Sequence, residues 1–167
     1  MANSVRSRDS GHFSEEWRRM GVQVVTGGAF NGKKEWVLKQ IVTEYHLGHT
    51  WFNLYKNMEY GWLPVSDLGD KMVVIEGIEA GLKQAMDQKN QAAPLFFQEY
   101  LLPLLSWEKK YAEREVIIIG TDISKGIVPL EKQTRDWRDE TGRLYQNLFQ
   151  NADHVYRIWF GIAQQLK

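Results

Sequence analysis

Short runs of apolar residues alternate along the chain with longer stretches in which apolar residues recur at helical spacing. The runs are rich in β-branched residues and stop at polar or glycine-containing turns, a pattern typical of buried strands. They predict strands at residues 22–26, 72–75, 116–119 and 155–160. The stretches between them predict helices at about 33–44, 78–88, 95–113 and 131–150. This alternation predicts an α/β fold with a mostly parallel sheet and helices on both faces.

Three parts of the chain depart from this alternation. Residues 1–20 are polar and without clear periodicity, so we expect a flexible N-terminal arm ahead of a single domain over residues 21–167. Residues 45–70 are aromatic and punctuated by glycine, and they predict no element. Pro103 interrupts the third helical stretch and predicts a kink or a break there.

A glycine-rich loop follows the first predicted strand and opens the first predicted helix. It fits the phosphate-binding pattern G-x-x-x-x-G-K with Gly27, Gly28, Ala29, Phe30, Asn31, Gly32 and Lys33, and Lys34 comes next. Glycines let successive backbone N–H groups point at phosphate oxygens, the helix N-terminus favours an anion, and Lys33 would reach the terminal phosphates. The loop therefore predicts a nucleotide site for ATP or GTP; the alternative is a strand–helix turn that binds nothing.

The position after the loop lysine departs from the motif. A Ser or Thr hydroxyl there normally ligates Mg²⁺, whereas Lys34 adds a second positive charge. Phosphate would then be bound with less help from a metal, or phosphoryl transfer would be lost. Glu76 ends an apolar strand in the manner of an acid that holds Mg²⁺, and we take it with Lys33 as a candidate catalytic residue. The alternative for Glu76 is an ordinary carboxylate at a strand end.

The composition removes several classes of function. The chain has no cysteine, which excludes disulfides, iron–sulfur clusters and thiolate zinc sites. The 21 basic and 21 acidic side chains cancel, so nothing favours nucleic acid or an anionic membrane as a partner. No apolar run reaches the roughly 18 residues of a membrane span, and the N-terminus has no secretory h-region. We therefore expect a cytoplasmic protein.

The last predicted helix carries a cluster of charges. Arg135 and Asp139 are an i,i+4 pair, and Arg138 lies within one turn of both, so the cluster is either a solvated face or a binding surface. Asp122, after the third strand, is a further candidate for an acidic contact. Gly142 costs about 1 kcal/mol inside a helix, which predicts that another group approaches closely there.

From about residue 120 to the end, the chain resembles the bifunctional adenosylcobinamide kinase / adenosylcobinamide-phosphate guanylyltransferase family of cobalamin biosynthesis. The blocks that carry the resemblance are G-I-V-P at 126–129, R-D-W-R-D-E-T-G-R at 135–143, A-D-H-V at 152–155 and G-I at 161–162. The loop at 27–33 also resembles the family's G-G-A-x-x-G-K-S.

The resemblance implies a RecA-like P-loop fold and a homo-oligomer, of which a trimer is the expected form. It also implies phosphorylation of cobinamide and then transfer of GMP from GTP through a guanylylated histidine. The partners would be a small-molecule nucleotide and a corrinoid, and Arg135 and Arg138 would contact nucleotide or a neighbouring subunit.

The chain departs from the family pattern where the family has catalytic residues. Lys34 replaces the loop serine, and Leu54 falls near the position of the family histidine. Thr121–Ser124 stands where the family has Asn-Glu-x-Gly, and Tyr145 replaces an Asn. The comparison with the family pattern predicts that the family's second strand and its loop are largely missing from this sequence.

Four histidines are available as nucleophiles. His46 and His49 lie near the expected position but out of register, and either is a nucleophile or a packing residue, whereas His12 and His154 have no supporting constellation. The sequence thus predicts a kinase or nucleotidyltransferase of the family. Two alternatives stay open: a catalytically reduced paralogue that binds nucleotide or corrinoid as a regulatory or assembly subunit, and a P-loop kinase acting on an unrelated metabolite.

Overall fold

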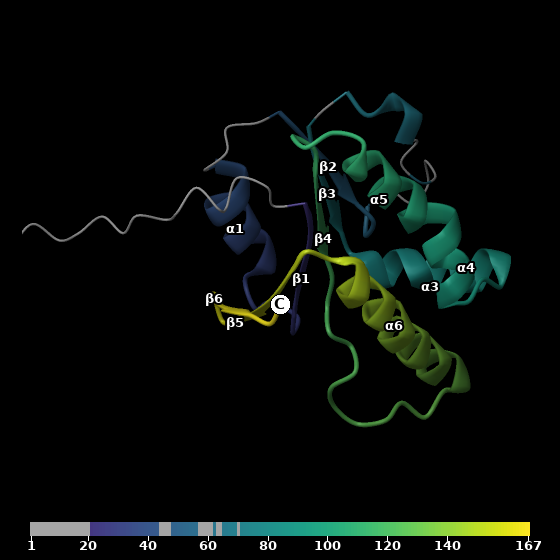
Figure 1. Ribbon diagram of the computed structural model, residues 1–167. Helices are drawn as coiled ribbons and strands as arrows, with labels where there is room; N and C mark the ends of the chain where they lie inside the picture. Colours follow the sequence, from purple (N-terminus) through teal and green to yellow (C-terminus); the bar gives the residue numbers. More distant parts are fainter. Residues whose placement is uncertain (1–20, 44–47, 57–61, 63–64, 70) are drawn as a thin grey trace, which may run out of the picture.

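A single six-stranded sheet organises the computed structural model, which describes residues 21–43, 48–56, 62, 65–69 and 71–167 (Figure 1). The strands are β1 (Val22–Gly27), β2 (His49–Asn53), β3 (Met72–Glu76), β4 (Glu115–Ile119), β5 (His154–Trp159) and β6 (Ile162–Gln165). Their order is β2-β3-β4-β1-β5-β6, and every neighbouring pair is parallel except β5 and β6.

Helices cover both faces of this sheet. The helical elements are α1 (Lys33–Val37), η2 (Leu38–Val42), η4 (Val65–Asp67), α3 (Ile78–Lys89), α4 (Ala93–Phe96), η5 (Phe97–Leu101), α5 (Leu102–Lys109) and α6 (Lys132–Asn151). Figure 1 shows α1 on one side of the sheet and α3 to α6 on the other. The α/β fold predicted from the sequence, with a mostly parallel sheet and helices on both faces, is confirmed.

The core is divided between the two faces because successive strand side chains point to opposite sides. Val24, Val73 and Ile118 belong to the larger cluster beneath α3 to α6, whereas Val25 and Val74 belong to the smaller cluster beneath α1 and η2. Each fully buried Val, Leu or Ile contributes about 1.5–3 kcal/mol. The central strands β1, β3 and β4 are therefore fixed in register, and so are the loops at their carboxyl ends.

Each of the four predicted strands and each helical stretch is found, with ends shifted by up to four residues. The third helical stretch divides into α4, η5 and α5, and Pro103 lies in the first turn of α5, where its missing N–H costs nothing. Strands β2 and β6 were not predicted. The expectation that the second strand is missing is wrong, because β2 pairs with β3 along its whole length.

Some expectations fall outside the described residues. The flexible arm at residues 1–20 is one of them, so the division of the chain into an arm and one domain over 21–167 stays a prediction. Within the described part of the chain, no helix is both long enough and apolar enough to cross a membrane.

Candidate functional site

The glycine-rich loop lies at the carboxyl end of β1, and its backbone requires glycine at two positions. Gly27 has φ of +150°, and a Cβ there would lie 2.2 Å from the carbonyl oxygen of Ile158 in the neighbouring strand β5. Gly32 has φ of +84° and directly precedes α1. A side chain at either position strains the loop, so the curl of the motif is built into the structure.

The tip of the loop is held by the hairpin of β5 and β6. Asn31 donates its side-chain amide to the Ile158 carbonyl at 3.3 Å, and the Asn31 carbonyl accepts the N–H of Gly161 at 2.9 Å. Phe30 is fully exposed and has φ of +57°, which is unusual for a bulky residue. The hairpin therefore fixes the loop while Phe30 projects into solvent.

Lys33 points back across the mouth of the loop. Its Nζ donates to the Gly28 carbonyl at 2.7 Å and to the Gly27 carbonyl at 3.4 Å. Burial lowers the pKa of Lys33, and the negative charges of Glu79 and Glu76 act against that shift. The ammonium thus sits between the loop backbone and two carboxylates, where it can neutralise a phosphate.

A cavity of about 600 Å³ opens above this ammonium. Its wall is formed by the loop from Ala29 to Glu35, by Glu76 and Gly77 at the end of β3, and by Tyr55 and Thr121. The volume is in the range of ordinary ligand pockets. The structure therefore brings the predicted loop residues and Glu76 together at one edge of the sheet.

Glu76 is surrounded by hydrogen-bond donors. Its Oε2 accepts Nε1 of Trp51 at 2.8 Å and Nδ2 of Asn53 at 2.9 Å, and Nζ of Lys34 lies 3.5 Å from the same oxygen. The Lys34 ammonium also lies 5.3 Å from the centre of the Trp51 ring. Position 34 thus offers a cation where the motif has a hydroxyl.

These residues do not fit Mg²⁺ held by the protein. One carboxylate oxygen of Glu76 already accepts two hydrogen bonds and lies beside the Lys34 ammonium, and this cation opposes a second cation. Among the described residues, no group of three or more His, Cys, Asp or Glu side chains could hold a metal ion. The choice of Glu76 as a metal ligand therefore remains a prediction that its donor set argues against.

Glu79 is a site residue that was not among the candidates chosen from the sequence. It is buried in the first turn of α3, where its carboxylate accepts the Tyr55 hydroxyl and the N–H of Thr121, the latter at 3.0 Å. Its backbone carbonyl accepts Nε1 of Trp137 at 2.9 Å. Burial, with the charge of Glu79, raises the pKa of Tyr55, so this hydroxyl stays protonated and remains a donor. Glu79 thus joins the ends of β2, β3 and β4.

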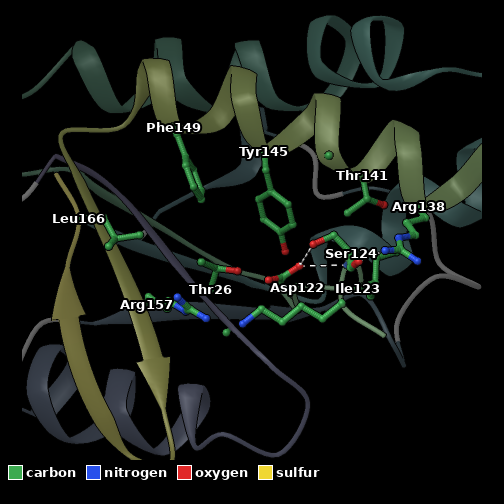
Figure 2. A pocket seen from close by; sticks show the side chains of 13 residues that line it. Thr26, Asp122, Ile123, Ser124, Arg138, Thr141, Tyr145, Phe149, Arg157 and Leu166 are labelled. Carbon is green, nitrogen blue, oxygen red and sulfur yellow. Dashed lines mark hydrogen bonds between the residues drawn. The ribbon is translucent and has the colours of Figure 1, made fainter. Parts of the chain in front are cut away.

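The C-terminal residues gather at a second pocket, on the face of the sheet covered by α6 (Figure 2). Asp122 and Arg138 line it, and Arg138 donates to the Ser124 carbonyl. Arg135 lies elsewhere and donates to the carbonyls of Pro129 and Leu130. No described residue of the chain makes the close approach predicted at Gly142, because a Cβ there would meet no heavy atom within 4 Å.

Tyr145 connects the second pocket to the turn after β4. Its hydroxyl donates to the Thr121 carbonyl at 3.0 Å, and a Cβ on Gly120 would lie 2.2 Å from that hydroxyl oxygen. Burial raises the pKa of Tyr145 well above its ordinary value. The tyrosine that replaces the expected asparagine is therefore a neutral anchor for this turn.

None of the histidines that the structure describes lies at this edge. His49 begins β2 and His154 begins β5, so both stand at the opposite, amino-terminal edge of the sheet. Leu54, near the expected histidine position, is buried in the larger cluster. His12 and His46 lie outside the described residues.

Comparison with solved structures concerns the fold. The crystal structure of flagellar accessory protein FlaH from Methanocaldococcus jannaschii is similar with a TM-score of 0.53 and 10% sequence identity, over 89% of this chain and 79% of that chain. In the present sheet, β4 lies between the loop strand β1 and the strand β3 that bears Glu76. The RecA-like P-loop fold expected from the sequence is confirmed.

Comparison with sequences concerns the family. A search of curated proteins found no match. A family model described as "Cobinamide kinase / cobinamide phosphate guanyltransferase" matches residues 48–166, most of the chain but not the glycine-rich loop. This match covers β2 to β6, and with them Glu76, Glu79 and the residues of the second pocket other than Thr26 and Gly27. The chain belongs to the cobinamide kinase / cobinamide phosphate guanyltransferase family.

Proposed function

We propose that the chain binds the phosphates of ATP or GTP in the loop from Gly27 to Lys34 and acts as a kinase on a cobinamide intermediate of cobalamin biosynthesis. Family membership supports the pathway and the use of a nucleotide. The observation that carries the proposal is the Lys33 ammonium, held at the loop mouth by two glycine carbonyls beneath a cavity of about 600 Å³.

Each residue of the loop has a role in this proposal. The backbone N–H groups between Gly28 and Lys33 hold phosphate oxygens, and the Lys33 ammonium neutralises charge on the terminal phosphate. Lys34 supplies a second ammonium close to the phosphates. Glu76 holds Lys34, and Asp122 offers an acidic group on the acceptor side.

Of the family's two reactions, the kinase reaction is favoured by the positions of the described histidines. Transfer of GMP through a histidine needs an imidazole within reach of the phosphates, and both described histidines stand at the far edge of the sheet. A reduced paralogue that binds ligand without turnover is the second candidate. It is favoured by the two hydrogen bonds and the Lys34 ion pair that already engage Oε2 of Glu76.

Self-association and a cytoplasmic location complete the proposal. Trp159, Phe160 and Ile162 in the β5–β6 hairpin expose apolar side chains, and burial of such a patch stabilises association. This supports a homo-oligomer of the trimeric kind expected from the family. Sedimentation of the full chain would give its mass, and a monomer at micromolar concentration would contradict this part of the proposal.

The test of nucleotide binding is a titration of the full chain with ATP and GTP, with and without Mg²⁺. We expect binding to the wild-type protein and a loss of at least about tenfold in affinity for Lys33→Met, because a charged hydrogen bond to phosphate is removed. Lys39→Met, an exposed lysine in the next turn, is the matched control and should bind as the wild type does. Failure of the wild type to bind either nucleotide refutes the proposal.

The reaction is tested separately, by turnover of adenosylcobinamide to its phosphate. Product formation supports the kinase, and tight binding without product supports the reduced paralogue. Incubation with labelled GTP tests the second reaction, because a guanylylated histidine leaves an acid-labile adduct. We expect no adduct.

A further inference from the structure

The cavity above the phosphate loop contains a tyrosine hydroxyl that touches a carboxylate. Tyr55 follows β2 and lines this cavity of about 600 Å³ together with Lys33 and Lys34. Its hydroxyl donates to the buried carboxylate of Glu79. Oγ1 of Thr121 lies 3.4 Å from the same hydroxyl oxygen. A phenol paired with a carboxylate in this way has the arrangement of a nucleophile and its base.

The position of the Tyr55 ring is set by the backbone at the ends of β2 and β3. A Cβ on Gly77 would lie 2.7 Å from the ring, and Gly77 has φ of +86°, so glycine at this position leaves room for the ring. The N–H of Tyr55 donates to Oδ1 of Asn53 at 2.9 Å, and Nδ2 of Asn53 donates to Glu76. The ring therefore rests against the end of β3, and its hydroxyl reaches the turn after β4.

The carboxylate that accepts the Tyr55 hydroxyl also acts on the loop lysine. Of the negative charges that raise the pKa of Lys33, that of Glu79 has the largest effect, ahead of Glu76. Lys33 is the residue that would neutralise the terminal phosphate of a bound nucleotide. The phenol and the ammonium thus face one cavity around one carboxylate, on the side of the loop where the terminal phosphate would lie.

The phenol enters any such reaction in its protonated form. Burial, with the charge of Glu79, raises the pKa of Tyr55 well above its ordinary value. A neutral hydroxyl becomes a nucleophile when a neighbouring base takes its proton in the transition state. Glu79 already accepts that proton in a hydrogen bond, and the N–H of Thr121 holds its other oxygen at 3.0 Å. Nucleophile, base and a group that orients the base are therefore all present.

We propose that Tyr55 is a phosphoryl acceptor, whose hydroxyl oxygen attacks the terminal phosphorus of a nucleoside triphosphate bound in the loop of the same chain. The inference rests on the nucleotide binding of the proposed function. A bond forms between the phenolic oxygen and the γ-phosphorus, and the bond from that phosphorus to the β,γ-bridging oxygen breaks. The phenolic proton passes to Glu79, and the nucleoside diphosphate leaves. Lys33 stabilises the charge on the phosphoryl group in transit.

The experiment is incubation of the full chain with ATP labelled at the γ-phosphate, with and without Mg²⁺, followed by acid treatment and mass spectrometry of the labelled peptide. A phosphotyrosine ester survives acid, whereas the phosphoramidate of a modified histidine does not. We expect acid-stable label on Tyr55. The initial rate per chain should stay the same after about tenfold dilution of the protein, because both reacting groups belong to one chain.

Variants identify the residues that take part. Tyr55→Phe should carry no acid-stable label, whereas Tyr111→Phe is the matched control and should be labelled as the wild type is, since the two tyrosines are 54% and 55% exposed. Glu79→Gln keeps an oxygen that accepts the hydroxyl but cannot take its proton, so labelling should slow by about a hundredfold or more. Lys33→Met should remain unlabelled, which excludes a contaminating kinase as the source.

Two controls keep a damaged fold from imitating these results. Thermal unfolding of each variant shows whether it is folded at the assay temperature. Labelling is compared at ATP concentrations that saturate each protein, so a change of affinity does not enter the rate. If Tyr55→Phe does not fold, the labelled peptide of the wild type decides by itself.

Two results overturn the inference. One is a wild type that binds ATP and carries no acid-stable label, and the other is label that persists in Tyr55→Phe or maps to another residue. Either result leaves the proposed nucleotide binding intact. Failure of the wild type to bind ATP in the titration refutes the proposed function and the inference together, so the two failures are distinguishable.

Discussion

Replacement of Lys34 by serine should convert the nucleotide site from one that is indifferent to Mg²⁺ into one that depends on it. In the wild type, an ammonium lies 3.5 Å from Oε2 of Glu76 and at the edge of the loop cavity. Lys34→Ser removes this cation and leaves the Glu76 charge facing the phosphates. It also restores the hydroxyl that the motif uses toward Mg²⁺.

The size of the effect follows from the exposure of the two side chains. Unit charges about 4 Å apart interact by about 1 kcal/mol in bulk water and about 4 kcal/mol at an effective dielectric constant of 20. The Lys34 side chain is 47% exposed and the Glu76 side chain is 14% exposed. Solvent therefore screens the charge of Lys34, and its interaction energy lies in the lower part of the range from about 1 to about 4 kcal/mol. A loss of about 1–2 kcal/mol corresponds to a roughly 5- to 30-fold weaker affinity for ATP.

The assay is a fluorescence or calorimetric titration with ATP, in EDTA and in excess Mg²⁺. The wild type should show nearly equal affinities in the two buffers. Lys34→Ser should bind about 5- to 30-fold more weakly in EDTA and recover in Mg²⁺. Lys39→Ser removes an exposed lysine from the next turn and should behave as the wild type. The reasoning is refuted if Lys34→Ser binds ATP in EDTA as tightly as the wild type.

Three further predictions concern stability. Gly27→Ala should lower the free energy of unfolding by about 2–5 kcal/mol, because its Cβ would lie 2.2 Å from a carbonyl oxygen of β5. Gly32→Ala, whose Cβ would have its nearest contact at 3.6 Å, should lower it by about 1–2 kcal/mol. Equal losses of stability in thermal unfolding would contradict this difference. Burial raises the pKa of Glu115 from 4.5 to about 7, so the folded state binds the Glu115 proton more firmly than the unfolded state does. The free energy of unfolding should therefore fall by up to about 3 kcal/mol as pH rises from about 4.5 to about 7. Glu115→Gln should flatten this dependence of stability on pH, and an unchanged dependence would refute the role of Glu115. Tyr55→Phe removes the hydroxyl that donates to the buried Glu79 carboxylate and should lower the free energy of unfolding by about 1–3 kcal/mol. Tyr111→Phe, the control, should change the denaturant midpoint little. Equal effects of the two variants would show that the Tyr55–Glu79 hydrogen bond is unimportant for stability.

The sequence predicted those elements whose burial is complete. Strands β1, β3 and β4 are buried along nearly their whole length, and such strands appear in the sequence as continuous apolar runs. Strands β2 and β6 lie at the two edges of the sheet and are partly or fully exposed, so their residues carry no comparable pattern. Backbone pairing, which leaves no mark in hydropathy, determines where these edge strands form.

The site was predictable where chemistry follows local spacing. The loop from Gly27 to Lys33 requires particular residues at adjacent positions, and these are visible in the sequence. The contacts of Glu79 with Tyr55 and Thr121 join residues 24 and 42 positions away. A glycine inside a helix, such as Gly142, is compatible with either a close neighbour or open space, and the sequence does not tell which; in this chain a Cβ there meets no described atom within 4 Å.

The two pockets meet at one short turn after β4, where Thr121 lines one pocket and Asp122 lines the other. Asp122 donates its N–H to the Gly27 carbonyl at 2.9 Å, which ties the turn after β4 directly to the phosphate loop. Thr121 donates its N–H to Glu79 on the loop side and accepts the Tyr145 hydroxyl on the α6 side. Because Gly120 leaves room for that hydroxyl, a tyrosine at 145 can hold the turn from within the protein. The turn can therefore keep the two pockets in a fixed relation to each other.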